Sequence, residues 1–407
     1  MATHPGLTLM GRPAQKPRYR PSSGPVWLSA GYRPFFVLAA LWALVVLPLS
    51  VAAMLGSVAL PIAVDPVRWH FHELIYGYIA AAVAGFLLTA VPNWTGRLPL
   101  QGGPLLGLLA LWLAGRLAMI AADWIGPGLA AAADLSFLAV LLAAAGREIV
   151  AGRNWRNLPL LAVVAAFLGG NGLFHAVSAG LLPADGFDQR LAIACIALLI
   201  SLIGGRITPS FTRNWLAKRG GGALPAAFGV VDRAALLAIL IALLLWIVDP
   251  DGLALAAVAA AAAALALVRL LRWQGYRVLG EPLLWVLHLG YLWIPIGLAL
   301  IAASALGSAA SGVAAVHALT VGAMGTMTLA VMSRAIFGHG GHELRAGPAL
   351  TAAFALITLA AAARIAATVA ALPYVELIHL SAAAWIGAFA LFLLACAPKA
   401  LSARAGR

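Results

Sequence analysis

The sequence predicts an all-α polytopic membrane protein with about 12 transmembrane helices, and three observations carry this prediction. The 407 residues are 63% hydrophobic and only 10% charged, whereas soluble domains average about 25% charged residues. Apolar runs recur along the whole chain, each close to the roughly 20 residues that a spanning helix needs. No alternation of period 2 persists, so helices are expected rather than the strands of a barrel.

Proline, glycine or charged residues bound each apolar run. The first half contains runs at 35–56, 68–92, 103–123, 127–147, 158–180 and 189–208. The second half contains runs at 229–249, 252–272, 282–306, 311–335, 347–370 and 374–397. We expect one 12-helix transmembrane domain over 35–398, a flexible basic cytoplasmic tail over 1–34 without a cleaved signal peptide, and a short cytoplasmic tail over 399–407.

The distribution of basic residues predicts the orientation. The chain carries 26 Lys and Arg against 13 Asp and Glu, a formal charge of +13. With both termini cytoplasmic, only Arg68 and Arg190 fall in outer loops, and only Arg116 and Arg364 fall within spans. This is the asymmetry of the positive-inside rule. No basic stripe with interleaved aromatic residues appears, so membrane lipid is the expected partner and nucleic acid is not.

Similar exits end every fourth span. The second ends at 91–97 with Pro92 and Arg97, the sixth at 208–215 with Pro209 and Arg213, and the tenth at 330–334 with Arg334. The recurrence predicts a threefold repeat of four-helix units. The alternative, that cytoplasmic exits simply share this composition, stays open.

The segment Trp69-His70-Phe71-His72-Glu73 places two imidazoles and a carboxylate at the outer mouth of the second span. Ionisable groups within a span are costly and mark candidate functional sites. Imidazole is also the commonest metal ligand. On a helix the two histidines are about 200° apart, so this spacing favours two neighbouring centres, or one ligand and one supporting group.

Other histidines converge on the same outer layer. His175, His317 and His379 lie at similar expected depth in the fifth, tenth and twelfth spans. A bundle core builds metal sites from facing helices, so His70, His72, His175 and His317 are the candidate cofactor and metal ligands. A lone membrane histidine is otherwise a helix–helix hydrogen bonder.

Four further residues are candidates for supporting the ligands or relaying protons, namely Glu73, Tyr76, His288 and Tyr291. Glu73 would orient an imidazole, relay protons or cap the helix. The stretch 317–334 is rich in glycine and threonine, which indicates close helix packing or room for a flat macrocycle.

A second class of function is a transporter or channel with a His- and Glu-lined path. Twelve spans fit a carrier, and Glu73, Arg116, Asp134 and Arg364 would line the path. Flux that survives loss of His72 and His317 would favour this reading. The sequence assigns no catalytic residue and leaves open whether the protein is an enzyme.

Long motifs resemble the NnrS family of bacterial membrane proteins. They are 29–36 (SAGYRPFF), 69–73, 84–97 (AGFLLTAVPNWTGR), 204–215 (GGRITPSFTRNW), 281–293 and 317–334. The family pattern His-Ala-His-Glu-Met stands here as His70-Phe71-His72-Glu73-Leu74. The resemblance thus covers nearly the whole chain beyond the basic tail.

The resemblance implies a haem- and copper-containing protein of the bacterial inner membrane that acts in nitric oxide metabolism or nitrosative-stress tolerance. His72 and His317 are then the first candidates for haem, followed by His70 and His175. Nitric oxide or nitrosylated iron species and an unidentified electron donor are the implied partners. The outer histidines and the repeat also resemble the core subunit of haem–copper oxidases, although the paired His-His of nitric oxide reductases is absent here.

Overall fold

The computed structural model describes residues 24–220, 222–369 and 371–405. Within these ranges, helices are the only regular secondary structure. Twelve helical spans are long and apolar enough to cross a membrane, which confirms the predicted fold class and the number of helices. The predicted tail lies outside the described residues over 1–23. The first long helix, α1, begins at Tyr32 and the last, α15, ends at Leu401, a few residues beyond the expected limits.

The first six spans contain most of the short interruptions. Their elements are η1 (Val26–Leu28), α1 (Tyr32–Met54), α2 (Pro66–His72), η2 (Glu73–Ile79), α3 (Ala80–Thr95), α4 (Gly103–Ile120), α5 (Ala122–Ile125), α6 (Pro127–Ala151), η3 (Trp155–Asn157), α7 (Leu158–Ser178) and α8 (Phe187–Ala217). The remaining elements are α9 (Val230–Val248), α10 (Leu253–Leu271), η4 (Gly275–Arg277), α11 (Pro282–Ala305), α12 (Ala309–His317), η5 (Ala318–Gly325), α13 (Thr326–Gly340), α14 (Pro348–Ala366) and α15 (Tyr374–Leu401).

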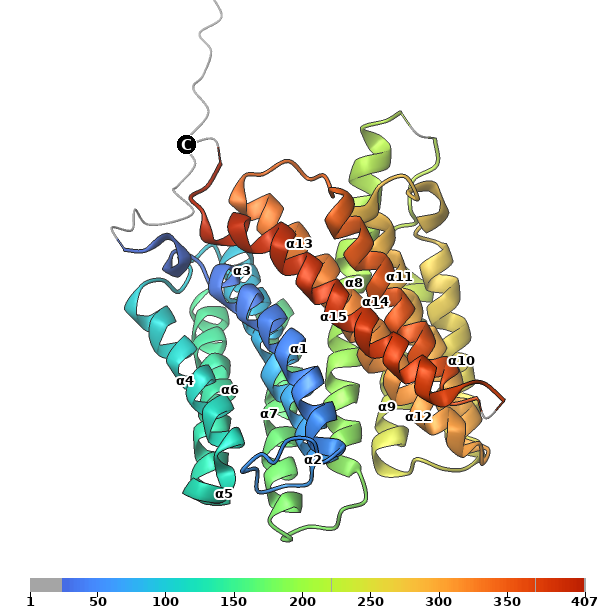
Figure 1. The fold of residues 1–407 in the computed structure, drawn as a ribbon. Coiled ribbons are helices and arrows are strands. Elements are labelled where there is room, and N and C mark those ends of the chain that lie inside the picture. Colours follow the sequence, from blue (N-terminus) through green and yellow to red (C-terminus); the bar gives the residue numbers. More distant parts are fainter. Residues whose placement is uncertain (1–23, 221, 370, 406–407) are drawn as a thin grey trace, which may run out of the picture.

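Successive spans pack around a ring that closes where α15 contacts α1 (Figure 1). Three long spans also reach the centre, where α8 contacts η5 and α3 contacts α13. They are span 2 (Pro66–Thr95), span 6 (Phe187–Ala217) and span 10 (Ser311–Gly340), with 30, 31 and 30 residues. These inner spans recur every four spans, which is the period of the predicted repeat.

Span 2 and span 10 share a construction that the sequence pattern did not reveal. In each, a short α-helix ends at a histidine, His72 or His317, and a π-helical segment follows before the α-helix resumes. Each span then ends at a glycine with positive φ, Gly96 (φ 69°) or Gly341 (φ 75°), the left-handed conformation that commonly terminates helices. π-helical segments occur frequently at functional sites.

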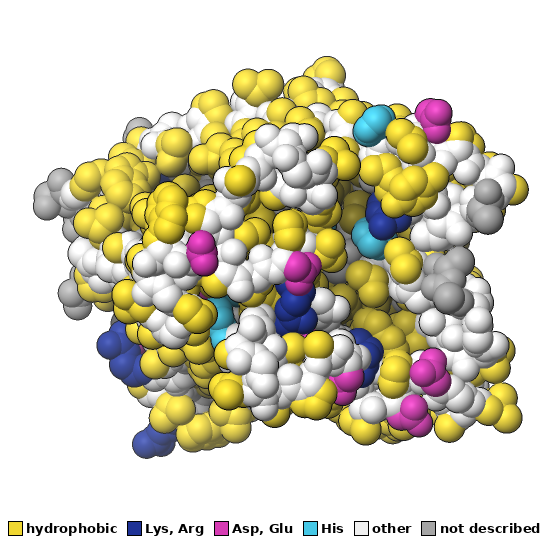
Figure 2. All heavy atoms as spheres, turned by 60° about the horizontal axis from the view of Figure 1, so that its bottom comes forward, with side chains coloured by type: hydrophobic (Ala, Val, Ile, Leu, Met, Phe, Trp, Pro, Cys, Tyr) yellow, Lys and Arg dark blue, Asp and Glu magenta, His cyan; other side chains and the backbone are white. Residues whose placement is uncertain are grey.

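The described part of the chain begins and ends at one end of the bundle, which we call the terminal end. Arg33, at the start of α1, donates hydrogen bonds to the carbonyls of Ala400 (2.7 Å) and Ser402 (2.5 Å). The opposite end, called the far end, carries the start of span 2. In a view tilted toward that end, Figure 2 shows acidic side chains on the surface, while some histidine and basic side chains lie deeper between apolar groups.

Candidate metal centre

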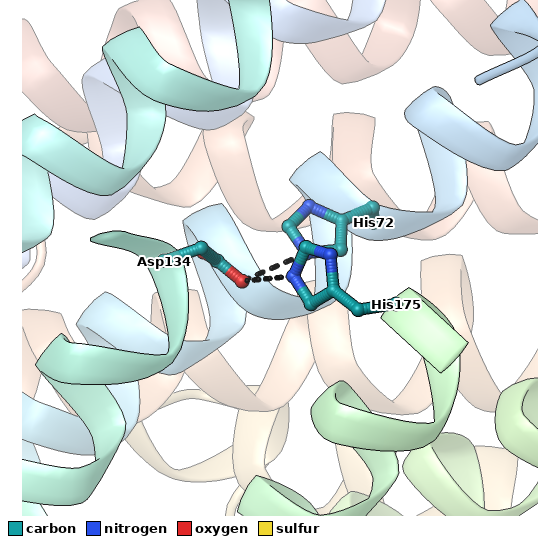
Figure 3. A group of neighbouring side chains, drawn as sticks. All are labelled: His72, Asp134 and His175. Atoms are coloured by element: carbon teal, nitrogen blue, oxygen red, sulfur yellow. Dashed lines mark hydrogen bonds and ion pairs between the residues drawn. The ribbon is translucent and has the colours of Figure 1, made fainter. Parts of the chain in front are cut away.

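A buried polar cluster lies near the far end of the bundle, among spans 2 to 5. His72 comes from the end of α2, Asp134 from α6 and His175 from the last turns of α7 (Figure 3). Asn171, one helical turn before His175, lies on the same face of α7. His72, Asp134 and Asn171 are completely or almost completely buried, while the side chain of His175 is 13% exposed.

One carboxylate oxygen connects the two histidines. Oδ2 of Asp134 lies 3.1 Å from Nε2 of His72 and 3.0 Å from Nε2 of His175 (Figure 3). It also accepts a hydrogen bond from the Asn171 amide at 2.7 Å. The ligand atoms of His72, Asp134 and His175 all lie within 4.8 Å of one another. Two imidazoles and a carboxylate at this separation form a donor set suited to a transition-metal ion.

Glu73 and Arg116 hold the cluster in place. Oε1 of Glu73 lies 3.0 Å from Nδ1 of His72, and it accepts a hydrogen bond from Arg116 at 2.6 Å. The other arm of the Arg116 guanidinium bonds Oδ1 of Asp134. Oε2 of Glu73 accepts a hydrogen bond from the indole of Trp42 at 2.9 Å. Glu73 therefore orients the imidazole of His72, one of the roles expected for it.

The charges of the cluster do not balance without the histidines. Glu73 and Asp134 contribute two negative charges and Arg116 contributes one positive charge, and all three side chains are at most 1% exposed. An uncompensated charge at a site this deeply buried costs several kcal/mol of stability. One further positive charge, as a proton on an imidazole or a monovalent metal ion, would neutralise the site.

His70 points to different partners from His72, as the 200° separation on a helix suggested. Its Nδ1 lies 2.8 Å from Oγ of Ser50 in α1. When the hydroxyl of Ser50 donates its hydrogen to the carbonyl of Val46, 2.7 Å away, its oxygen accepts the N–H of His70. Nε2 of His70 is then the nitrogen with a free lone pair.

His317 adopts the same tautomer. Its Nδ1 donates to the carbonyl of Val313 at 2.8 Å, which leaves the lone pair on Nε2. His317 interacts electrostatically with His70 and with Arg364 of α14. Within the described residues, no hydrogen-bond partner faces the Nε2 atom of either His70 or His317. Spans 2 and 10 therefore present two available imidazole nitrogens within electrostatic range of one arginine.

The remaining sequence candidates have different surroundings. The ring of Tyr76 lies 5.2 Å from that of His72, and its buried hydroxyl has no hydrogen-bond partner within the described residues. His288 and Tyr291 of α11 are not brought to this site. His288 bonds Thr212 of α8 at 2.8 Å, and Tyr291 accepts a hydrogen bond from Arg269 of α10 at 2.9 Å.

The glycines of the stretch 317–334 are packed against side chains. Gly322 lies against the indole of Trp293 and has no room for a larger residue, and a Cβ at Gly325 would press against Ile357 and Trp385. Of the two interpretations of this stretch, close helix packing is the one these contacts support.

The sequence pointed to two further residues of the cluster, but for a different function. Arg116 and Asp134 were expected to line a transport path together with Glu73 and Arg364. The structure pairs Arg116 with both carboxylates and puts Arg364 within electrostatic range of His70 and His317. Trp42 and Ser50 were missed, because a tryptophan or a serine in an apolar run carries no signal of a polar neighbour.

Comparison with protein-family models finds one that covers nearly all of the chain. The model described as NnrS protein matches residues 26–404. A search among curated proteins found no match.

Proposed function

Because the chain belongs to the NnrS family, which supports a nitric oxide-related role for this multi-pass membrane protein, we propose that it binds copper and haem near the far end. The observation that carries the proposal is the buried cluster of His72, Asp134 and His175 with its unbalanced negative charge. Its proposed ligand is nitric oxide or a nitrosylated iron species, and an external donor supplies electrons.

We assign copper to His72, His175 and Asp134. Imidazole suits copper, zinc, iron and nickel alike, so the donor atoms alone do not select the metal. The net charge does discriminate: Glu73, Asp134 and Arg116 sum to −1, and a monovalent ion brings this buried site to neutrality. Cu(I) is the monovalent ion among these metals, whereas a divalent ion would leave one uncompensated positive charge.

We assign haem to His70 and His317 rather than to His72 and His317. Both ring nitrogens of His72 face carboxylate oxygens, whereas Nε2 of His70 and of His317 carries an available lone pair. Arg364 supplies the positive charge that a haem carboxylate requires. When bound, haem and copper would supply electron transfer and affinity for nitric oxide.

The protein's own residues would prepare both sites. Glu73 accepts the Nδ1–H of His72, which turns Nε2 toward Asp134 and His175. Ser50 and the carbonyl of Val313 do the same for His70 and His317. Such outer hydrogen bonds fix the tautomer of a metal-binding imidazole and raise its basicity.

The proposed location is the bacterial inner membrane, with the terminal end in the cytoplasm. The loops and helix ends there carry most of the basic residues, among them Arg147, Arg213, Arg272 and Arg345. This asymmetry is the one the positive-inside rule describes. The copper and haem sites would then lie toward the periplasmic face.

Purification followed by metal analysis and a reduced-minus-oxidised optical spectrum tests the proposal. We expect about one copper and a Soret band in the full-length protein. His175→Ala should lose copper and keep haem, and His317→Ala should lose haem and keep copper. His288→Ala is the matched control, because it removes a buried histidine that lies in neither site, and it should keep both.

Two results would overturn the assignment. Protein that carries neither copper nor haem after expression with both supplied would remove its basis. A Soret band that His70→Ala and His317→Ala leave unchanged would place haem elsewhere. Nitric oxide added to the reduced protein should shift the spectrum, and an unchanged spectrum would argue against nitric oxide as the ligand.

A further inference from the structure

A cavity remote from the clusters of His70, His72, His175 and His317 opens near the terminal end. Its volume is about 460 Å³ and it lies among the inner spans 2, 6 and 10. Phe86 and Trp94 of α3, Ile207 and Phe211 of α8 and Val331 of α13 form much of its wall. The cavity is therefore bounded by aromatic and aliphatic groups at the centre of the ring.

The charged groups that line this cavity are basic. Arg206 of α8 and Arg334 of α13 both face it, and no acidic residue is among its lining. The guanidinium of Arg334 stacks on the ring of Phe211 at 3.9 Å. Within the described chain Arg334 forms no ion pair, and it interacts with Glu281 only at longer range. Arg206, which is exposed, donates to the neutral amide oxygen of Asn157 at 3.3 Å, and it too forms no ion pair within the described chain.

An apolar cleft continues from this cavity toward the middle of the bundle. The two share Phe36, Phe86, Ile203, Ile207 and Val331. The cleft has a volume of about 90 Å³, and it reaches Ile79 and Met327 between almost entirely apolar walls. Two arginines thus lie at the mouth of a narrow hydrophobic slot.

We propose that this cavity binds an anionic phospholipid from the leaflet at the terminal end. The phosphate would lie between Arg206 and Arg334, and one acyl chain would enter the cleft beyond Phe86 and Ile203. Basic pockets between transmembrane helices are suited to anionic head groups. A neutral lipid would bring no net negative charge to the two guanidinium groups, and a free phosphate would leave the apolar slot unused.

Native mass spectrometry of the full-length protein, incubated in detergent with dioleoylphosphatidylglycerol, tests the proposal. We expect one retained lipid, and Arg206→Gln/Arg334→Gln should retain it at least tenfold less. Arg153→Gln/Arg233→Gln is the matched control, because it removes two exposed arginines near the same end; it should stay within twofold of the unaltered protein. The unfolding midpoint and metal content of each variant report whether the fold and the far-end site are intact.

A second variant separates the head group from the chain. Val331→Phe fills the junction of cavity and cleft and should reduce lipid retention while leaving both arginines in place. Equal retention in the Arg206→Gln/Arg334→Gln protein, or equal retention of dioleoylphosphatidylcholine, would overturn the proposal. Displacement of the lipid by an equal concentration of glycerol phosphate would instead identify a site for free phosphate anions.

Discussion

Two buried clusters in this molecule each set an arginine against a carboxylate, and they differ in charge balance. At the far end, one arginine, Arg116, faces two carboxylates and two histidines complete the group. Nearer the terminal end, Arg269 bonds Asp232 at 3.0 Å, and Arg272 adds a second positive charge 3.8 Å from the same carboxylate.

The difference separates a candidate site from a structural ion pair. Nη1 of Arg269 also donates to the carbonyl of Ser201 (3.0 Å) and the hydroxyl of Tyr291 (2.9 Å), and the charges of Arg269 and Asp232 already balance, so that cluster needs no additional cation. The far-end cluster lacks one positive charge and presents imidazole nitrogens at the place where the charge is missing. An unbalanced buried charge beside metal-binding side chains is thus more informative than burial alone.

The largest expected effect on copper binding is that of Asp134→Asn. The change removes a metal ligand and one partner of Arg116, so copper content should fall at least about tenfold. The free energy of unfolding should fall by about 1.5–3 kcal/mol, the cost of a lost hydrogen bond between charged groups, because Arg116 keeps Glu73 as its buried partner. Metal analysis and detergent denaturation measure the two quantities on one preparation.

Asp232→Asn is the matched control in the other cluster. It should cost about 3–5 kcal/mol of stability because Arg269 loses its carboxylate and stays buried as an unpaired charge, yet copper content should be unchanged. If both variants lose copper equally, the loss reflects unfolding and the contrast between the clusters fails.

Arg116→Gln is expected to change which metal binds. The fixed charge at the site becomes −2, which a divalent ion neutralises better than Cu(I) does. Stability should drop by about 3–5 kcal/mol, and the ratio of bound zinc to bound copper should rise in protein expressed with both metals. An unchanged ratio would show that charge balance does not select the metal.

Glu73→Gln should have a smaller effect. The amide oxygen can still accept the Nδ1–H of His72, but the imidazole loses the basicity that a carboxylate confers. Copper affinity should fall by about 10–100-fold, as measured by competition with a copper chelator. Affinity equal to that of the unaltered protein would mean that Glu73 only fixes the ring.

The smallest expected effects on stability are those of removing the hydroxyl from either of two buried tyrosines. Tyr291→Phe removes a hydrogen-bond acceptor from Arg269 and should cost about 1.5–3 kcal/mol. Tyr76→Phe removes a hydroxyl without a described partner, and its denaturation midpoint should hardly move. A large loss in Tyr76→Phe would reveal a water or ligand bonded to that hydroxyl.

Much of the fold could be predicted from the sequence, because lipid imposes both helix length and charge asymmetry. The candidate ligands His72 and His175 were also found, since an imidazole within a span is conspicuous. Their connection through Asp134 was not predicted, because it depends on how α6 packs between α4 and α7. Helical periodicity predicted that His70 and His72 have different partners. It could not identify Ser50 as the partner of His70.

The π-helical segments after His72 and His317 determine which face each span presents at its two ends. A π-helical segment contains about one residue more than an α-helical segment with the same number of turns. In an α-helix, one residue corresponds to about 100° of rotation. The face that carries each histidine is therefore set out of phase with the face that the same span turns toward the arginine-lined cavity. Deleting one residue from Glu73–Ile79 would rotate the two parts of span 2 relative to each other. Either the imidazoles of His70 and His72 or the side chains that line the cavity would then lose their present positions.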